Sequence, residues 1–210
     1  WSAGAEKRLT YLRDIIQRTE LNAIVIDIKD YTGKISYDAD IDLVDRYGAE
    51  EQRILFPNRL LKRLHDEGVY VIGRIAVFQD QQLVLHRPDL AVQSSSTKTV
   101  WRDRKGLGWI DAGAKEAWDY NLAIAKDALA RGFDEINFDY IRFPTDGNLS
   151  DMAFPLSQSA PSKTSVLKEF FSYLRVQLPT AKISADIFGL VLLQNNDQGI
   201  GQYFEDIIPY

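Results

Sequence analysis

Apolar residues concentrate in four short runs, at residues 22–28, 70–77, 135–140 and 182–187, each only lightly interrupted by polar positions. Runs of this length and continuity are typical of strands that are buried on both faces of a parallel sheet. Polar or charged residues follow or end each run. The pattern therefore predicts four parallel strands whose carboxyl ends carry the polar side chains.

An amphipathic stretch precedes each of these runs, with apolar residues recurring every three or four positions, as on one face of a helix. These faces are formed by Leu9, Leu12 and Ile16; by Leu60, Leu61 and Leu64; by Trp118, Leu122, Ala125 and Leu129; and by Leu167, Phe170, Phe171 and Leu174. We expect Gly132 to close the third helix in the left-handed conformation and Pro179 to end the fourth. Alternating helices and strands predict an α/β fold.

The architecture we expect is a (β/α)8 TIM-type barrel that is incomplete in this chain, with its first and last strands missing. A barrel has eight strands and typically about 250 residues, whereas four strands are visible here in 210 residues. We interpret Ile207-Ile208-Pro209-Tyr210 as the beginning of a further strand. The alternative, an open doubly wound sheet, is less favoured because no Gly-rich phosphate-binding loop follows a strand. Length and the 45% hydrophobic content support one domain over residues 1–210.

Two connections, residues 78–111 and 145–164, are too long for simple turns. They follow the second and third strands, so they are either the rims of a substrate groove or disordered insertions. The first contains Trp101 and Trp109, whose indoles would suit stacking on a sugar ring, with loop anchoring as the competing explanation for one of them. Asp111 ends this connection.

Composition excludes several classes of function. The net charge of −5 argues against a nucleic-acid partner and against membrane contact by this domain. There is no cysteine, and the chain's two histidines, His65 and His86, have no second ligand at metal-binding spacing, so we expect no metal and no cofactor. A neutral polymer remains possible as a partner.

The sharpest chemical signal is Asp139, which ends the third strand in the sequence Asn137-Phe138-Asp139-Tyr140-Ile141-Arg142. Asp186 takes the matching position of the next strand. Adjacent strands lie about 4.8 Å apart, so the two carboxylates can approach the roughly 5 to 5.5 Å separation of a retaining glycosidase pair. In the alternative interpretation Asp139 forms a structural ion pair with Arg74 or Arg142, and Asp186 caps the following loop.

Charged residues also end the first strand and interrupt the second. Asp27 and Lys29 would share one side of their strand and Asp30 the other, as sugar-binding groups or as solvated charges. Arg74 lies inside an apolar run, where an unpaired cation is improbable, so we expect Asp27 or Asp139 as its partner.

Residues 22–30, 68–80, 109–144 and 184–189 resemble a bacterial family of glycosyl hydrolase domains, most specifically in the stretch from Gly132 to Pro144. That family is similar to a (β/α)8 barrel distantly akin to the α-amylase superfamily. The resemblance implies Asp139 as nucleophile and Asp186 as general acid. The amylase-type pattern has Arg two residues before its nucleophile, where this chain has Asn137, and usually Glu as its acid.

We therefore expect a glycoside hydrolase that cleaves an oligo- or polysaccharide with Asp139 as nucleophile and Asp186 as acid/base. The expected substrate-binding residues are Asp27, Lys29, Asp30, Arg74, Trp101, Trp109, Asp111, Tyr140 and Arg142. The family resemblance implies an extracellular or cell-envelope location in a bacterium. The rival is a non-catalytic glycan-binding barrel of a cell-envelope or surface assembly, in which the same carboxylates hold sugar hydroxyls.

Overall fold

A parallel sheet forms the centre of the molecule in the computed structural model, which describes residues 6–210. Its strands, within these residues, are β1 (Ala23–Lys29), β2 (Tyr70–Ala76), β4 (Glu135–Asp139) and β6 (Ile183–Ala185), in the order β1-β2-β4-β6. All neighbouring pairs are parallel. The predicted α/β fold with a parallel sheet is confirmed, and each predicted strand is present with slightly different ends.

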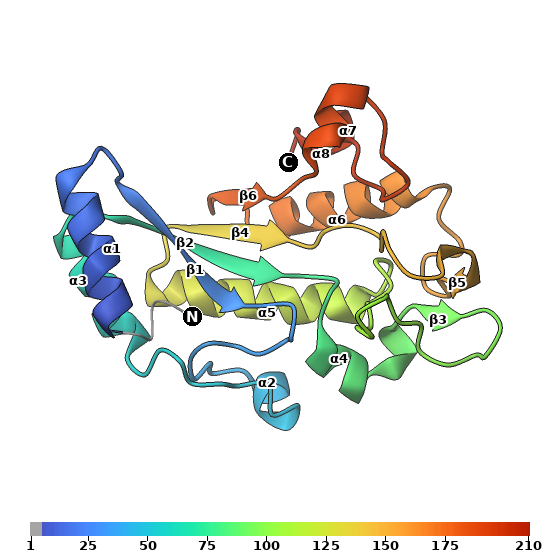
Figure 1. The fold of residues 1–210 in the computed structure, drawn as a ribbon, viewed down its shortest axis with the longest axis horizontal. Helices are drawn as coiled ribbons and strands as arrows, with labels where there is room; N and C mark the ends of the chain where they lie inside the picture. The colour runs from blue at the N-terminus through green and yellow to red at the C-terminus, as the bar shows by residue number, and fades with distance from the viewer. Residues whose placement is uncertain (1–5) are drawn as a thin grey trace.

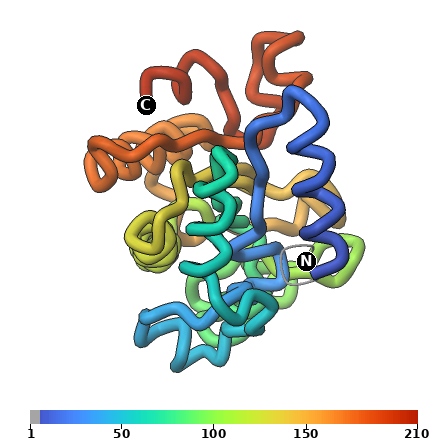
Figure 2. The backbone as a smooth tube through the Cα atoms, turned by 90° about the vertical axis from the view of Figure 1, so that its left-hand side faces the viewer, coloured from blue at the N-terminus to red at the C-terminus, as the bar shows by residue number. Residues whose placement is uncertain are grey.

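A long helix precedes each strand, as the amphipathic stretches predict. These helices are α1 (Glu6–Arg18), α3 (Pro57–Asp66), α5 (Lys115–Arg131) and α6 (Lys163–Gln177). Gly132 closes α5 with a φ of 111°, a left-handed conformation that glycine adopts without steric cost. Helices α5 and α6 lie on the same side of the strands (Figure 2).

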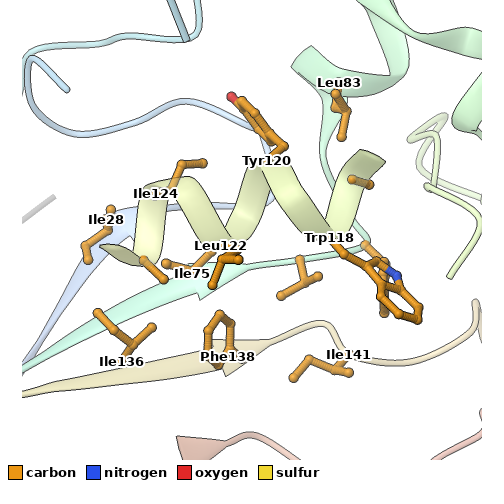
Figure 3. Close-up of a cluster of buried hydrophobic side chains, with 14 of the residues drawn as sticks. Ile28, Ile75, Leu83, Trp118, Tyr120, Leu122, Ile124, Ile136, Phe138 and Ile141 are labelled. Carbon is orange, nitrogen blue, oxygen red and sulfur yellow. The ribbon is translucent and has the colours of Figure 1, made fainter. Parts of the chain in front are cut away.

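The hydrophobic core lies between α5 and the sheet (Figure 3). Leu122 of α5 lies near Ile75 of β2 and Phe138 of β4, Trp118 lies near Ile141, and all five side chains are buried. Alanines on the same helix, among them Ala125 and Ala128, are also fully buried and let the helix approach the strands closely. Burial of this apolar surface is the main force that holds the helix on the sheet.

The opposite face of the sheet is only partly covered. Val25, which points to that face from β1, is 55% exposed, whereas its neighbour Ile26 is buried. The expectation that these strands are buried on both faces is therefore wrong for this part of the chain, because within residues 6–210 the long helices cover one face only. The strands instead alternate between buried apolar side chains under the helices and more exposed side chains on the open face, which include the apolar Val25 and Ile72 as well as the polar Asp27 and Arg74.

The two long connections are folded and joined to each other. Residues 78–111 contain α4 (Gln81–His86), the 3₁₀ helix η2 (Pro88–Leu90) and β3 (Gln93–Ser94), and β3 pairs antiparallel with β5 (Met152–Ala153) of the second connection. The 3₁₀ helix η3 (Leu149–Asp151) precedes β5. Both connections lie beyond the carboxyl ends of β2 and β4 (Figure 1). They are rims of that end of the sheet and not disordered insertions.

Shorter helices complete the chain: α2 (Asp42–Arg46), α7 (Gly189–Gln194) and α8 (Phe204–Ile207). The prediction of a strand beginning at Ile207 is wrong, since Ile207 ends α8 and its apolar side chain packs against the core beside α6. Within residues 6–210, none of the helices combines the length and the apolar character that crossing a membrane requires.

Candidate active site

A row of polar side chains crosses the open face of the sheet. Strand register places Asp27 of β1 opposite Arg74 of β2, Arg74 opposite Asn137 of β4, and Asn137 opposite Ser184 of β6. Because side chains alternate along a strand, the residues two positions further on share this face. Asp139 is that residue on β4, and Asp186 follows β6 at the matching height, with its N–H donating to the carbonyl of Phe138 at 3.0 Å.

Arg74 lies at the centre of this row and contacts carboxylates on three sides. Its Nη1 donates to Asp27 Oδ1 at 2.6 Å, its Nη2 donates to Asp139 Oδ2, and its Nε lies 3.8 Å from Asp186 Oδ2. Burial acts to lower the pKa of Arg74, but the hydrogen bond to Asp27 and the negative charge of Asp139 outweigh it and raise the pKa above the ordinary value. The predicted partners of Arg74 are confirmed.

The two candidate catalytic carboxylates differ in how firmly they are held. Asp139 is the less exposed, at 19% of its side chain, and its second oxygen accepts a hydrogen bond from the backbone N–H of Tyr140 at 2.6 Å. Tyr140 adopts a φ of 54°, a conformation that costs a non-glycine residue free energy. The side chain of Asp186 is 54% exposed, and its Oδ1 accepts a hydrogen bond from the Asn137 amide at 3.2 Å.

Asn137, Ser184 and Glu135 belong to the same polar network, although the sequence analysis assigned them no role. The Asn137 amide donates to Ser184 Oγ at 3.2 Å, and the Ser184 hydroxyl donates to Glu135 at 2.5 Å. A signal for them is present in the sequence, since Asn137 and Ser184 each stand two residues before a candidate carboxylate and must share its face. Asn137 supports Asp186, while Arg74 from the neighbouring strand supplies the cation beside Asp139.

A cavity of about 200 Å³ lies beyond the strand ends, and some of the residues that line it directly follow Asp139 in the sequence. Trp109, Tyr140 and Arg142 line it, and the Arg142 guanidinium lies 4.7 Å from the centre of the Trp109 ring. Trp109 reaches this cavity from the connection 78–111, in line with the prediction that one of the two indoles in this connection lies at the site. Its ring is otherwise buried, so it offers an edge of the cavity wall and not a broad stacking platform.

Trp101 lies away from this cavity and anchors the loops. Its Nε1 donates to the carbonyl of Asn148 at 3.0 Å, and Gly147 packs so closely on the ring that a Cβ there would lie 2.8 Å from it. Ser94 donates to Asp151 at 2.6 Å across the same contact between the two connections. The predicted sugar contact of Trp101 is therefore replaced by the competing explanation, loop anchoring.

Lys29 does not share a side with Asp27, contrary to the prediction. The register of β1 against β2 shifts between these two residues, which turns Lys29 away from the open face. Its side chain is 0% exposed, its ammonium lies 2.6 Å from Asp80, and it lies 5.4 Å from the centre of the Tyr120 ring of α5. Burial lowers the pKa of Lys29, with the negative charge of Asp80 acting in the opposite direction. This ion pair is structural.

Asp30 and Asp111 are also structural in this arrangement and are not placed to contact a sugar. Asp30 is buried, accepts a hydrogen bond from the Thr32 N–H at 2.9 Å and pairs with Arg53 at 3.0 Å. Asp111 is fully buried and binds the second connection through the N–H groups of Leu156 and Ser157, at 2.8 and 3.2 Å. Both aspartates are buried acceptors for backbone N–H groups of the loops that they contact.

The structure thus brings together Asp27, Arg74, Asp139 and Asp186, with Trp109, Tyr140 and Arg142 beside them, and separates Lys29, Asp30, Trp101 and Asp111 from this cluster. Residues 6–210 hold no group of three or more His, Asp or Glu side chains arranged to bind a metal ion. The cluster can orient two carboxylates beside one cation, a geometry suited to acid/base or nucleophilic chemistry.

Solved structures resemble this chain closely. A hypothetical protein from Ruminiclostridium thermocellum is 41% identical, with a TM-score of 0.82, and the match covers 90% of this chain and 95% of that one. No curated protein matches the sequence.

More distant solved structures share the fold. An α-galactosidase from Thermus thermophilus matches 86% of this chain at 18% identity with a TM-score of 0.56, and α-L-fucosidase isoenzyme 2 from Paenibacillus thiaminolyticus matches 83% at 13% identity with a TM-score of 0.58. The match spans 34% and 28% of those proteins, respectively. At such identities the similarity concerns the fold alone. A family described as "Putative glycosyl hydrolase domain" matches residues 1–210 in full, and this chain belongs to that family.

Proposed function

We propose that this chain is the catalytic region of a glycoside hydrolase of the (β/α)-barrel type that cleaves an oligo- or polysaccharide. In this proposal Asp139 is the nucleophile and Asp186 the general acid and base of a retaining mechanism. Family membership and the fold shared with an α-galactosidase and an α-L-fucosidase support the reaction class. From the family resemblance alone, we also propose an extracellular or cell-envelope location in a bacterium.

The observation that carries the proposal is the common height of Asp139 and Asp186 on neighbouring strands. The register pairs Phe138 with Ala185, and the next residues of the two strands are the two aspartates. Strands spaced about 4.8 Å apart bring carboxylates near the roughly 5 to 5.5 Å of retaining glycosidases, whereas inverting enzymes need about 6.5 to 9.5 Å.

Their surroundings support different roles for the two groups. Hydrogen bonds to both oxygens fix the direction of the Asp139 carboxylate, and a nucleophile must hold a near-attack geometry. Asp186 is more exposed and has weaker contacts, so it can reach a leaving-group oxygen at the open face. Arg74 holds the two groups beside each other, and Asp27 offsets part of the Arg74 charge.

The second candidate is a non-catalytic glycan-binding protein, and the Arg74 contacts favour it. A carboxylate that is bound to an arginine within the protein is less available to attack a sugar, and the same polar face could hold hydroxyl groups by hydrogen bonds. In that case the Asp139–Arg74 pair would be structural, and oligosaccharides would be bound but not changed.

The test is a screen of the full chain against neutral and acidic polysaccharides, with reducing-end release and binding measured on the same samples. For a substrate that is cleaved, proton NMR of the first product should show the retained anomeric configuration. Mass spectrometry of a trapped intermediate should place the glycosyl ester on the peptide containing Asp139. In the alternative mechanism an acetamido group of the substrate attacks and a carboxylate only orients it, so no adduct forms on the protein. Binding without any release would establish the glycan-binding alternative.

A further inference from the structure

Arg142 is a cation without an acidic partner beside the candidate active site. Its guanidinium lies 4.7, 4.9 and 5.6 Å from the ring centres of Trp109, Phe188 and Tyr140. Its hydrogen bonds run from Nη1 alone, to the Phe143 carbonyl at 3.2 Å and the Thr145 hydroxyl at 3.3 Å. Within residues 6–210 it has no carboxylate within 4.0 Å, so Nη2 and Nε remain as free donors.

Several other partly buried arginines of the described chain lie 3.0 Å or less from an acidic side chain, among them the pairs Arg13–Glu67, Arg53–Asp30, Arg74–Asp27 and Arg131–Asp127. Arg175 forms no such pair, but it donates hydrogen bonds to three backbone carbonyls, whereas Arg142 donates to one. A desolvated cation costs free energy unless an anion or hydrogen-bond acceptors replace its water. Burial lowers the pKa of Arg142, although the group stays charged at neutral pH. The two hydrogen bonds and the surrounding aromatic rings offset part of this cost, but no acidic side chain is paired with the guanidinium.

The cavity that Arg142 lines has the composition of a small polar binding site. It measures about 200 Å³, and its other lining residues include Tyr31, Gln79 and Lys105. Lys105 is exposed and places a second positive charge at the rim. Cavities for drug-sized ligands measure about 300 to 1,000 Å³, so this one suits a single small unit such as one sugar residue.

Acidic residues near the cavity limit which anion would fit. Asp103 also lines it, but its oxygens already accept hydrogen bonds, including those from the Lys105 and Leu107 N–H groups at 2.9 and 3.0 Å. Asp146 lines the cavity too, and the charges of Asp139, Asp146 and Asp103 all act on Arg142. These charges would repel a dianionic phosphate more strongly than a monoanionic carboxylate, whose planar shape also matches two free donors of a guanidinium.

We propose that Arg142 recognises the carboxylate of a uronic acid residue, so that the substrate is an acidic glycan. This inference rests on the proposed function, since it names the substrate of the same site. The free Nη2 and Nε donors form two hydrogen bonds to the carboxylate. The rings of Trp109 and Phe188 hold the guanidinium in position. Lys105 attracts the anion from solvent. The uronate unit occupies the cavity next to the carboxylates, and the bond to be cleaved lies at Asp139 and Asp186.

The test compares D-glucuronate, its uncharged amide D-glucuronamide, and glucose 6-phosphate by NMR titration of the full chain. The expected result is an affinity for glucuronate about tenfold or more above that for the amide, with glucose 6-phosphate weaker than glucuronate. Arg142→Gln should remove this preference. Arg104→Gln, a matched change of an exposed arginine outside the cavity, should retain it. A melting temperature for each variant shows whether it is folded.

Equal affinity for glucuronate and its amide, no binding of glucuronate, or an undiminished preference in Arg142→Gln would overturn the inference. A stronger affinity for glucose 6-phosphate than for glucuronate would also overturn it, and would indicate that Arg142 binds a phosphorylated sugar. The outcome is separable from that of the proposed function. An acid preference without hydrolysis of any glycan contradicts the reaction and leaves the inference standing, whereas cleavage of neutral glycans that Arg142→Gln does not alter contradicts the inference alone.

Discussion

Asp139 and Asp186 lie at matching heights of β4 and β6, and one guanidinium, that of Arg74 on β2, contacts both carboxylates. A third carboxylate, Asp27, binds the same guanidinium at 2.6 Å from the other side. Carboxylates this close repel each other, and the attraction of each to a shared cation offsets this repulsion. Arg74 therefore allows the protein to keep three acidic side chains together on an open face of the sheet.

Replacing Arg74 by Gln should destabilise the protein and inactivate it. The variant leaves three carboxylates without their cation, and we expect a loss of about 1 to 3 kcal/mol in the free energy of unfolding at pH 7. Urea denaturation at pH 7 checks this, with Arg104→Gln as the exposed control. A loss no larger than that of the control would contradict the role of Arg74.

Lys29→Met should be strongly destabilising without a direct effect on catalysis. The change leaves the fully buried Asp80 carboxylate unpaired, at an expected cost of about 3 to 5 kcal/mol. Adding Asp80→Asn should restore part of the loss, because the amide removes the buried charge and its oxygen can still cap Leu83. Chemical denaturation and turnover per folded molecule are the measurements. An unchanged stability together with a raised KM would show that Lys29 binds substrate after all.

The amino-acid pattern predicts the strands, the long helices and the facing positions of Asp139 and Asp186, because all three follow from local periodicity. Side chains alternate along a strand, so Asn137 and Ser184 could also have been placed on the site face. The position of Lys29 could not be predicted, since it depends on a register shift against β2 that no local residue type marks.

Long-range contacts explain the other differences between prediction and structure. Trp101 and Trp109 stand in similar polar surroundings in the sequence, and only the contact of Trp101 with Asn148 and Gly147, far along the chain, decides which indole anchors the loops. Ile207 follows the apolar pattern of a strand, but it packs beside α6 as part of the short helix α8. Phe188, near Arg142, had no signal in the sequence.

Asp111→Ala should weaken the joint between the two long connections. The substitution removes a fully buried acceptor of the Gly113, Leu156 and Ser157 N–H groups. Gly113 keeps its second hydrogen bond, to the Ser157 hydroxyl, whereas the Leu156 and Ser157 N–H groups lose this acceptor. We expect a loss of about 2 to 4 kcal/mol in the free energy of unfolding. The exposed Asp89, which pairs with Arg87, provides the matched control, and Asp89→Ala should cost less than about 1 kcal/mol. Similar losses for the two variants would contradict the structural role of Asp111.

Tyr70 should make the protein less stable in alkaline solution. Burial and the hydrogen bond to Glu135 raise the pKa of the Tyr70 hydroxyl to about 12 in the folded state, above its ordinary value of about 10. The unfolded chain therefore loses this proton first, so the stabilisation is complete below pH 10 and is lost as the pH rises towards 12. Unfolding free energies of the wild type and Tyr70→Phe at pH 8, 10 and 11 should converge. A constant difference would exclude this linkage.

The central claim, that Asp139 is a catalyst, is tested most directly by turnover of Asp139→Asn on a glycan that the wild type cleaves, with melting measured on the same preparation. We predict a loss of at least about 1,000-fold in kcat, because an amide cannot form the glycosyl ester. The unfolding free energy should change by less than about 1 kcal/mol, since Arg74 retains Asp27 and Asp186. A variant that melts far below the wild type, yet keeps near-normal turnover per folded molecule, would show that Asp139 is a structural partner of Arg74 and not the nucleophile.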